Sequence, residues 1–71
     1  MKKVFIKENF IKLDSALKLA SAVGTGGHAK IVIQNGEVAV NGEICFMRGK
    51  KLYNGDVFTF EGQNFVIENE N

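Results

Sequence analysis

The hydrophobic pattern of this chain changes period at Gly36, and no other feature of the sequence constrains the fold as strongly. Between residues 13 and 33 the apolar residues recur every three or four positions, as they do along one face of an amphipathic helix. After Gly36 they alternate with polar residues, which is the pattern of a strand with one buried face. A chain whose helices precede its strands is expected to fold as an α+β domain.

Two short helices are expected before the change of period. The apolar stripe of the first, over residues 13–23, consists of Leu13, Ala16, Leu17 and Ala20. Gly24 follows as a helix stop signal. Thr25 is the expected N-cap of the second helix, since its hydroxyl can accept a hydrogen bond from a first-turn amide. The stripe of this second helix, which ends at Gly36, consists of Ala29, Val32 and Ile33.

A β-hairpin is expected next, because Asn41-Gly42 is the strongest short signal for a two-residue turn. Such a turn pairs Val40 with Glu43 and Val38 with Cys45. Val38 and Cys45 then share a face of the hairpin, which predicts that the cysteine is a small core residue.

Three further strands are expected, at residues 4–6, 57–60 and 65–67. A basic loop over residues 47–54 would link the hairpin to the second of these strands, and residues 68–71 would fray. The expected fold is therefore two short packed helices followed by a small, mostly antiparallel sheet. Its core is predicted to contain Leu13, Leu17, Ala20, Ala29, Val32, Ile33, Val38, Val40, Cys45 and Phe58.

Length and composition exclude several classes of protein. With 71 residues, of which 45% are hydrophobic and 24% charged, the chain is expected to be one globular domain over residues 1–71. It has no apolar run long enough to cross a bilayer, and the apolar segment after its basic N-terminus is too short for a signal peptide. Cys45 is the only cysteine, which excludes an internal disulfide and a cysteine-rich zinc site. These features predict a cytoplasmic protein that does not contact a membrane.

The formal net charge of +1 hides an asymmetry along the chain. Residues 1–60 contain all nine basic residues and five acids, a net charge of +4, whereas residues 61–71 contain three acids and no base. Because a carboxylate beside a phosphate is repulsive, the tail acids Glu61, Glu68 and Glu70 are expected to lie away from any phosphate-binding surface.

Several short motifs resemble the S4 RNA-binding domain. They are the segment from Thr25-Gly-Gly-His-Ala-Lys to Asn41-Gly42, then Lys51 and Gly55-Asp56-Val57, with Leu13, Asp14 and Leu17 before them. The resemblance covers about residues 11–60, and the motifs agree with the family in order and spacing. Thr25-Gly-Gly-His-Ala-Lys and Arg48-Gly-Lys-Lys-Leu resemble more specifically the small stand-alone S4-like proteins of bacteria, of the YaaA/YbcJ type.

The resemblance implies an S4-like fold of the αL type and an RNA-binding surface built from the two helices and the basic loop. Carried over by position, the implied RNA-binding residues are Thr25, Gly26, Gly27, His28, Lys30, Arg48, Lys50 and Lys51. Ordinary S4 domains often carry arginine where this chain has Gly26 and Gly27, whereas the Gly-Gly form is usual in the smaller family. The departure removes side-chain charge from the implied surface.

The residues themselves favour the same kind of partner. The first turn of a helix has free amides and a partial positive charge, so it attracts phosphate. Gly26 and Gly27 would let a phosphate approach the backbone closely, and Lys30 would add a point charge one turn later. The basic loop offers further phosphate partners, among which arginine is capable of bidentate contact.

Each of these features also has an ordinary structural interpretation. Gly26 and Gly27 would suit a tight corner between the helices, and the basic loop would suit a solvated surface. Tyr53 would either stack on a base or pack into its turn. His28 has no second histidine, cysteine or acid at a spacing that suits a metal site or a catalytic pair. No cofactor, small-molecule substrate or enzymatic activity is therefore expected.

The leading hypothesis is a monomeric, non-catalytic module that grips structured RNA, with ribosomal or transfer RNA as the expected partner. The alternative is an adaptor that keeps the S4 shape and docks on a protein or ribonucleoprotein through Ile31, Ile44 and Phe46. A sulfur-carrier or ubiquitin-like protein would need a C-terminal Gly-Gly. The sequence ends in Glu68-Asn-Glu-Asn71, so that class is not expected.

Overall fold

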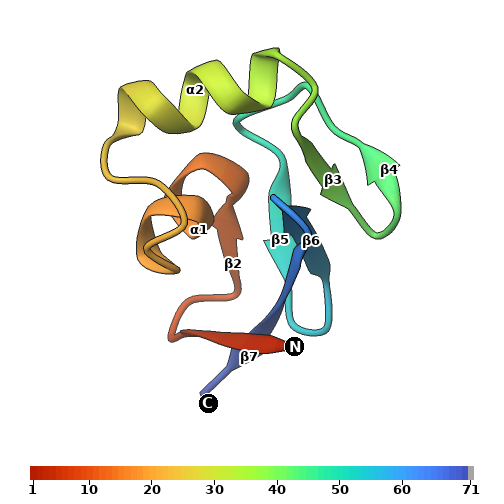
Figure 1. The fold of residues 1–71 in the computed structure, drawn as a ribbon. Coiled ribbons are helices and arrows are strands. Elements are labelled where there is room, and N and C mark those ends of the chain that lie inside the picture. The colour runs from red at the N-terminus through yellow and green to blue at the C-terminus, as the bar shows by residue number, and fades with distance from the viewer. Residues whose placement is uncertain (71) are drawn as a thin grey trace.

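The computed structural model describes residues 1–70, which form two helices and seven strands (Figure 1). The helices are α1 (Leu13–Leu19) and α2 (Gly26–Gln34). The strands are β1 (Lys2–Ile6), β2 (Phe10–Lys12), β3 (Val38–Val40), β4 (Glu43–Ile44), β5 (Lys51–Tyr53), β6 (Val57–Phe60) and β7 (Gln63–Asn69). The α+β class predicted from the change of period is confirmed.

Five strands form one sheet in the order β1-β7-β6-β3-β4. All neighbours in it are antiparallel except β1 and β7, which run parallel with Lys2 opposite Phe65. The remaining two strands, β2 and β5, form a separate antiparallel pair, called here the β2–β5 ribbon. In Figure 1 helix α2 lies at the top of the molecule, and β1, drawn in red, lies at the bottom.

The β2–β5 ribbon corrects the prediction of a loop over residues 47–54. Strand β5 occupies the second half of that segment, and Leu52 at its centre is fully buried. A three-residue strand contributes a single side chain to the core, so its alternation is too short to recognise in the sequence. Strand β2, which has the same length, was not predicted for the same reason.

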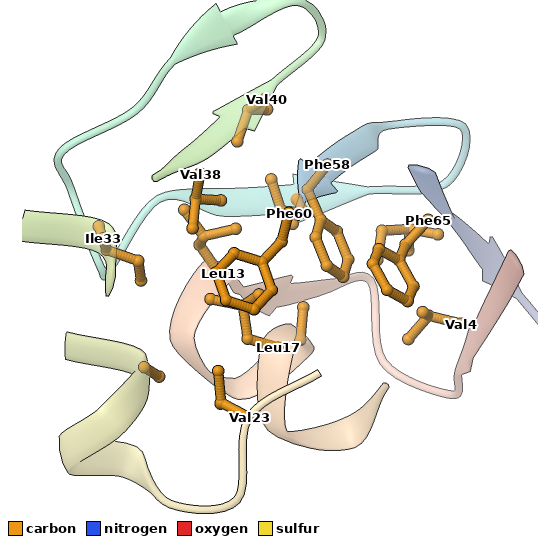
Figure 2. Close-up of a cluster of buried hydrophobic side chains, with 14 of the residues drawn as sticks. Val4, Leu13, Leu17, Val23, Ile33, Val38, Val40, Phe58, Phe60 and Phe65 are labelled. Atoms are coloured by element: carbon orange, nitrogen blue, oxygen red, sulfur yellow. The ribbon is translucent and has the colours of Figure 1, made fainter. Parts of the chain in front are cut away.

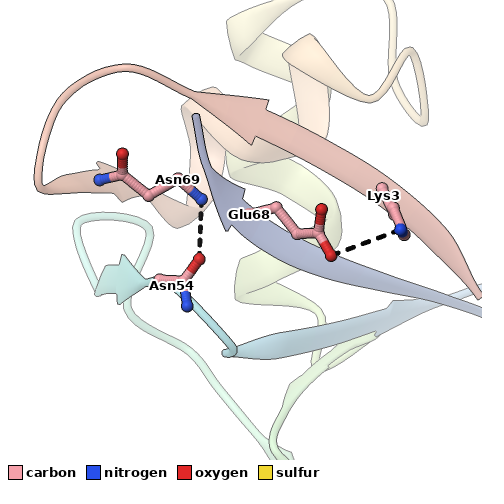
Figure 3. A network of polar contacts seen from close by, with 4 residues as sticks. All are labelled: Lys3, Asn54, Glu68 and Asn69. Atoms are coloured by element: carbon pink, nitrogen blue, oxygen red, sulfur yellow. Dashed lines mark hydrogen bonds and ion pairs between the residues drawn. The ribbon is translucent and has the colours of Figure 1, made fainter. Parts of the chain in front are cut away.

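The predicted fraying is wrong for residues 68–70. Strand β7 continues to Asn69, whose backbone amide donates to Asn54 Oδ1 at 2.8 Å (Figure 3). The Asn69 side chain donates to the Glu8 carbonyl at 2.9 Å, and the Glu70 amide donates to the Ile6 carbonyl at 2.9 Å. These bonds fasten the segment to β1 and to the turn before β6. Residue 71 lies outside the described part of the chain.

Helix α1 is shorter than predicted, because it ends at Leu19 rather than near residue 23. Ser21 takes a left-handed conformation with φ 58°, its amide donates to the Lys18 carbonyl, and the Ala22 amide donates to the Leu17 carbonyl. This pair of bonds is a Schellman motif. Serine seldom adopts that conformation, which is why Gly24 was predicted as the stop signal instead.

The predicted hairpin is confirmed. Asn41 has φ 50° and Gly42 has φ 87°, as a type I′ turn requires, and Val40 lies opposite Glu43. The Cys45 amide donates to the Val38 carbonyl at 2.9 Å, which confirms the predicted pairing of Val38 with Cys45.

Side-chain hydrogen bonds hold the hairpin turn against the turn before β6. Asn41 Nδ2 donates to Asp56 Oδ1 at 3.2 Å, and Asn41 Oδ1 accepts from the Val57 amide at 3.0 Å. Asp56 Oδ2 accepts from the Tyr53 amide at 2.7 Å. The Gly55-Asp56-Val57 motif therefore has a structural role, since it joins two turns that are distant in the sequence.

One core lies between the helices and the sheet (Figure 2). Eight of the ten predicted core residues are buried, and Ala20 and Cys45 are partly buried and packed against the rest. The rings of Phe58 and Phe65 stack at the centre of the sheet with centroids 4.7 Å apart. No buried polar or charged side chain occurs within residues 1–70, so apolar burial is what holds the layers together.

Within the described residues, neither helix is long and apolar enough to cross a membrane.

Candidate functional site

Helix α2 begins with the predicted cap. Thr25 is extended, and its Oγ1 accepts a hydrogen bond from the His28 amide at 3.0 Å. The amides at the start of an α-helix have no intrahelical partner. In α2 the two amides before His28 belong to Gly26 and Gly27, which are both exposed. His28 and Lys30 are exposed as well. All five predicted residues of this segment therefore lie on an open helix start.

The fold does not require glycine at position 26 or 27. Neither residue has a positive φ. A Cβ at Gly26 would lie 4.0 Å from Lys18 Cδ, and a Cβ at Gly27 would lie 3.9 Å from Thr25 Oγ1, which are ordinary contacts. A tight corner between the helices would show a left-handed backbone or a close approach, and neither is present at these two residues.

Residues 47–50 are the part of the predicted basic loop that precedes β5, and from here on they are called the basic loop. This loop lies against the start of helix α1. The Lys50 carbonyl accepts from the Leu13 amide at 2.9 Å, and the Arg48 carbonyl accepts from the Asp14 amide at 3.1 Å. The start of α1 is therefore closed by the loop backbone, whereas the start of α2 faces solvent. The side chains of Arg48 and Lys50 are exposed.

Lys51 belongs to the β2–β5 ribbon rather than to the loop. It lies directly opposite Lys12, and its Nζ lies 4.8 Å from the centroid of the Phe10 ring. Lys51 is exposed. An ammonium at this distance over an aromatic face is a cation–π contact, which restricts where the charge can lie.

The two predicted segments border opposite ends of helix α1. The start of α2 lies beside Lys18, near the end of α1, and the loop lies at the start of α1. Lys12 and Lys18, both exposed, were missed by the sequence reasoning. The signal for Lys18 was its place on the polar side of the α1 stripe, whereas Lys12 required the pairing of β2 with β5.

Six exposed cations lie on the two helices, on the loop at the start of α1 and on the β2–β5 ribbon, and we refer to them as the basic surface: Lys12, Lys18, Lys30, Arg48, Lys50 and Lys51. The same region includes the half-buried Asp14, whose Oδ1 accepts from the Ser15 amide at 2.7 Å.

Two of the three tail acids lie at the β1–β7 edge of the sheet, whereas Glu61 lies near Ser21, just beyond the end of α1. Glu68 pairs with Lys3 across β1 and β7 at 3.6 Å (Figure 3). The Glu70 amide donates to the Ile6 carbonyl at the end of β1. Glu61, in the turn between β6 and β7, lines a small pocket together with Lys2 and Ser21. The carboxylates of Glu68 and Glu70 therefore belong to the β1–β7 edge of the sheet.

A shallow groove of about 520 Å³ lies beside the basic loop. Its apolar lining includes Ile44, Phe46 and Met47, whose side chains are 55%, 63% and 66% exposed, and Lys50 lies at its rim. The Phe46 ring also lies beside Gly36, two residues beyond the end of α2, because a Cβ at Gly36 would lie 3.2 Å from it. Ile31 on α2 is 56% exposed.

Within residues 1–70, no group of histidine, cysteine, aspartate and glutamate side chains is arranged to hold a metal ion. The chemistry of the region is that of exposed cations, open amides and exposed apolar rings. Such groups bind anionic and aromatic partners without covalent chemistry.

Comparison with known proteins supplies the relatives of this fold. A family model described as the S4 domain matches residues 4–68. A protein of Bacillus subtilis (strain 168), described as a probable ribosome maturation protein, RlbA, is 44% identical over 59 residues, which cover 83% of each chain.

Two solved structures share the arrangement of helices and strands. The solution structure of YbcJ from E. coli, described as revealing an αL motif involved in RNA binding, matches with a TM-score of 0.73 and 28% identity over 96% of this chain and 87% of YbcJ. The 30S ribosomal protein S4e of Thermoplasma acidophilum matches with a TM-score of 0.64 and 20% identity over 84% of this chain and 32% of that protein, a likeness of fold alone. With the family match extending over nearly the whole described chain, this protein belongs to the S4 domain family.

Proposed function

We propose that this protein is a non-catalytic RNA-binding module that grips structured RNA by its phosphates. In this proposal the start of α2 receives one phosphate through the amides of Gly26 and Gly27, with Thr25, His28 and Lys30 around it. Arg48, Lys50 and Lys51 engage phosphates farther along the RNA backbone. RNA helices favour this mode, because their grooves offer shape and phosphates rather than readable base edges.

The observation that carries the proposal is the pair of glycines at the open start of α2. Glycine has a lower helix propensity than alanine, and neither a backbone angle nor internal packing requires glycine at these two positions. Absent side chains leave room for an external group to reach the amides. Lys18 beside Gly26 supplies a charge that suits a phosphate at that position.

The relatives indicate which RNA to test first. RlbA is described as a probable ribosome maturation protein, and YbcJ is described as having an αL motif involved in RNA binding. We therefore propose ribosomal RNA as the first partner to test, with transfer RNA as the second, for a protein that acts as a monomer in the cytoplasm.

The test is a titration of the double variant Lys50→Ala, Lys51→Ala against fragments of ribosomal RNA. The variant should bind more weakly by about 1–3 kcal/mol, at about 1 kcal/mol or more for each charged contact. The matched control is Lys2→Ala, Lys3→Ala, which removes the same charge from β1 at the far end of the molecule from α2 (Figure 1). Equal affinities of the two variants would mean that Lys50 and Lys51 are only solvated charges.

The exposed apolar groove favours a second candidate function, an adaptor that docks on a protein within a ribonucleoprotein. Ile44, Phe46 and Met47 line it, and residues of this kind are enriched in interface cores. Changing Ile44 to Ser and Met47 to Ser separates the two functions. If the variant keeps its affinity for protein-free RNA but no longer sediments with ribosomal particles, the groove is a protein-docking surface. If the variant keeps both its affinity for RNA and its sedimentation with the particles, the adaptor function is excluded.

A further inference from the structure

The β2–β5 ribbon has two chemically different faces. Leu52, buried completely, and its partner Ile11, half-buried, point toward the core. Because side chains alternate along a strand, the residues on either side of this pair share the outer face. That face carries Phe10 opposite Tyr53 and Lys12 opposite Lys51.

The outer face brings two rings and the Lys51 ammonium together, with Lys12 on the strand opposite Lys51. The centroids of Phe10 and Tyr53 are 6.0 Å apart with the rings tilted by 51°. Lys51 Nζ lies 4.8 Å from the Phe10 centroid. Phe10 is half-buried beneath these neighbours, whereas the Tyr53 side chain is 49% exposed and both lysines are exposed.

The opposed lysines and the exposed ring lower the stability of the isolated protein. Like charges directly opposite one another on neighbouring strands destabilise the pair, and an acid opposite either lysine would have stabilised it. The half-exposed Tyr53 ring also leaves apolar surface in water. A ligand that combines negative charge with a flat ring would relieve both conditions at once.

We propose that the outer face of the β2–β5 ribbon binds an unpaired nucleotide of the RNA. The base stacks on the exposed side of Tyr53, and the adjoining phosphate lies between Lys12 and Lys51. Phe10 acts as a positioning residue, because it holds the Lys51 ammonium from one side and the Tyr53 ring from the other. Aromatic rings combined with cations are how proteins hold unpaired bases, since every base offers a π-face.

This proposal rests on the proposed RNA-binding function and specifies its substrate. Lys51 directly follows the basic loop, and Lys12 directly precedes α1, so the ribbon is continuous with the basic surface. The favoured RNA is therefore a stem, gripped through its phosphates, with an unpaired nucleotide beside it.

The composition of the chain provides a direct readout. Tyr53 is the only tyrosine, and there is no tryptophan, so the intrinsic tyrosine fluorescence comes from this one side chain. Stacking of a base on the phenol ring quenches that emission. The probe is a short RNA hairpin whose loop is a non-nucleotide linker and which carries a single-stranded tail, so that its only unpaired nucleotides are in the tail. The comparison is the same hairpin without the tail. Free N-acetyltyrosinamide at equal absorbance corrects for light absorbed by the RNA.

The tailed hairpin should quench Tyr53 on binding, and the blunt hairpin should bind more weakly and leave the emission largely unchanged. Tyr53→Ala should lose about 5- to 100-fold in affinity for the tailed hairpin and little for the blunt one, as expected for one stacked base. Tyr53→Phe should stay within about twofold of the parent, because the ring is kept. Tyr53→Leu, which preserves the apolar contact with Phe10, guards against loss of the fold and should behave like Tyr53→Ala.

Three outcomes overturn the inference in different ways. If both hairpins bind equally and the emission is unchanged, the protein binds RNA but the ribbon is not a nucleotide site. If Tyr53→Leu binds the tailed hairpin as tightly as Tyr53→Phe, stacking is excluded even where quenching occurs. If neither hairpin binds at any salt concentration, the proposed RNA-binding function fails and the ribbon site fails with it.

Discussion

Gly26 and Gly27 are the residues for which stability and function should separate most clearly. Both have backbone angles open to any residue and room for a Cβ, so alanine at both positions should raise the free energy of unfolding by about 0.4–1 kcal/mol per site. RNA binding should weaken in the same variant, because the methyl groups occupy the approach to the amides. Chemical denaturation and an RNA titration on the same preparation measure both quantities.

A charge at position 27 gives a stronger version of the same prediction. Gly27→Glu should weaken RNA binding more than Gly27→Gln, because the new carboxylate would occupy the place where a phosphate meets the helix start. The fold should remain intact in both variants, since the position is exposed. Equal affinities of the two variants would argue against a phosphate at this helix end.

Gly42 has a structural role, and its substitution should affect stability alone. With φ 87° it adopts a conformation that a β-branched residue resists, so Gly42→Val should lower the free energy of unfolding by about 1–2 kcal/mol. Gly42→Asn is the control, because asparagine tolerates this region and should cost much less. An unchanged melting temperature of the valine variant would contradict the assigned turn.

At the scale of elements, the like-charge pair of the β2–β5 ribbon predicts opposed effects on stability and binding. Lys12→Glu replaces a repulsive cross-strand pair by an attractive one, so the melting temperature should rise by an amount that corresponds to about 0.2–1 kcal/mol. RNA binding should fall, because the variant brings a carboxylate into the basic surface. Lys2→Glu makes the same change of net charge on β1 and should reduce binding less.

The elements also show what the sequence could predict. The α+β class, the hairpin at Asn41-Gly42 and the cap at Thr25 were all correct, because each depends on contacts within a few residues. Strand β2 was missed because three residues such as Phe10–Lys12 have no detectable period, and its partner β5 lies about forty residues away. The end of α1 was misplaced because tertiary packing of Val23 and the bonds at Ser21 override the helical pattern.

The candidate site was likewise predictable only where it depends on contacts that are local in the sequence. The residues at the start of α2 were identified from a local pattern, whereas Lys12 and Phe10 became candidates only through the pairing of β2 with β5. The sequence predicted charge along the chain, but the opposition of Lys12 and Lys51 depends on the register of two distant strands. Both the missed site residues and the missed strands are therefore determined by long-range contacts.

For the whole molecule, the separation of charge predicts how binding should depend on salt. The six cations of the basic surface lie on the helices, the loop and the β2–β5 ribbon, and Glu68 and Glu70 lie at the β1–β7 edge. A few phosphate contacts should give a slope of log affinity against log salt concentration on the order of −2 to −4. Titrations over a range of potassium chloride concentrations measure this slope, and a flat dependence would favour the adaptor function instead.

The parallel pairing of β1 with β7 has a consequence for how the chain folds. Lys2 meets Phe65, so the edge of the sheet is completed by residues 63 positions apart. Closing a loop of that length is entropically slower than forming the β3–β4 and β6–β7 hairpins, whose partners are neighbours in the chain. Until β1 docks, one side of β7 is an unpaired strand edge, which is a surface open to pairing with another molecule. The docking of β1 therefore determines how long a newly made molecule keeps this unpaired edge and remains prone to aggregation.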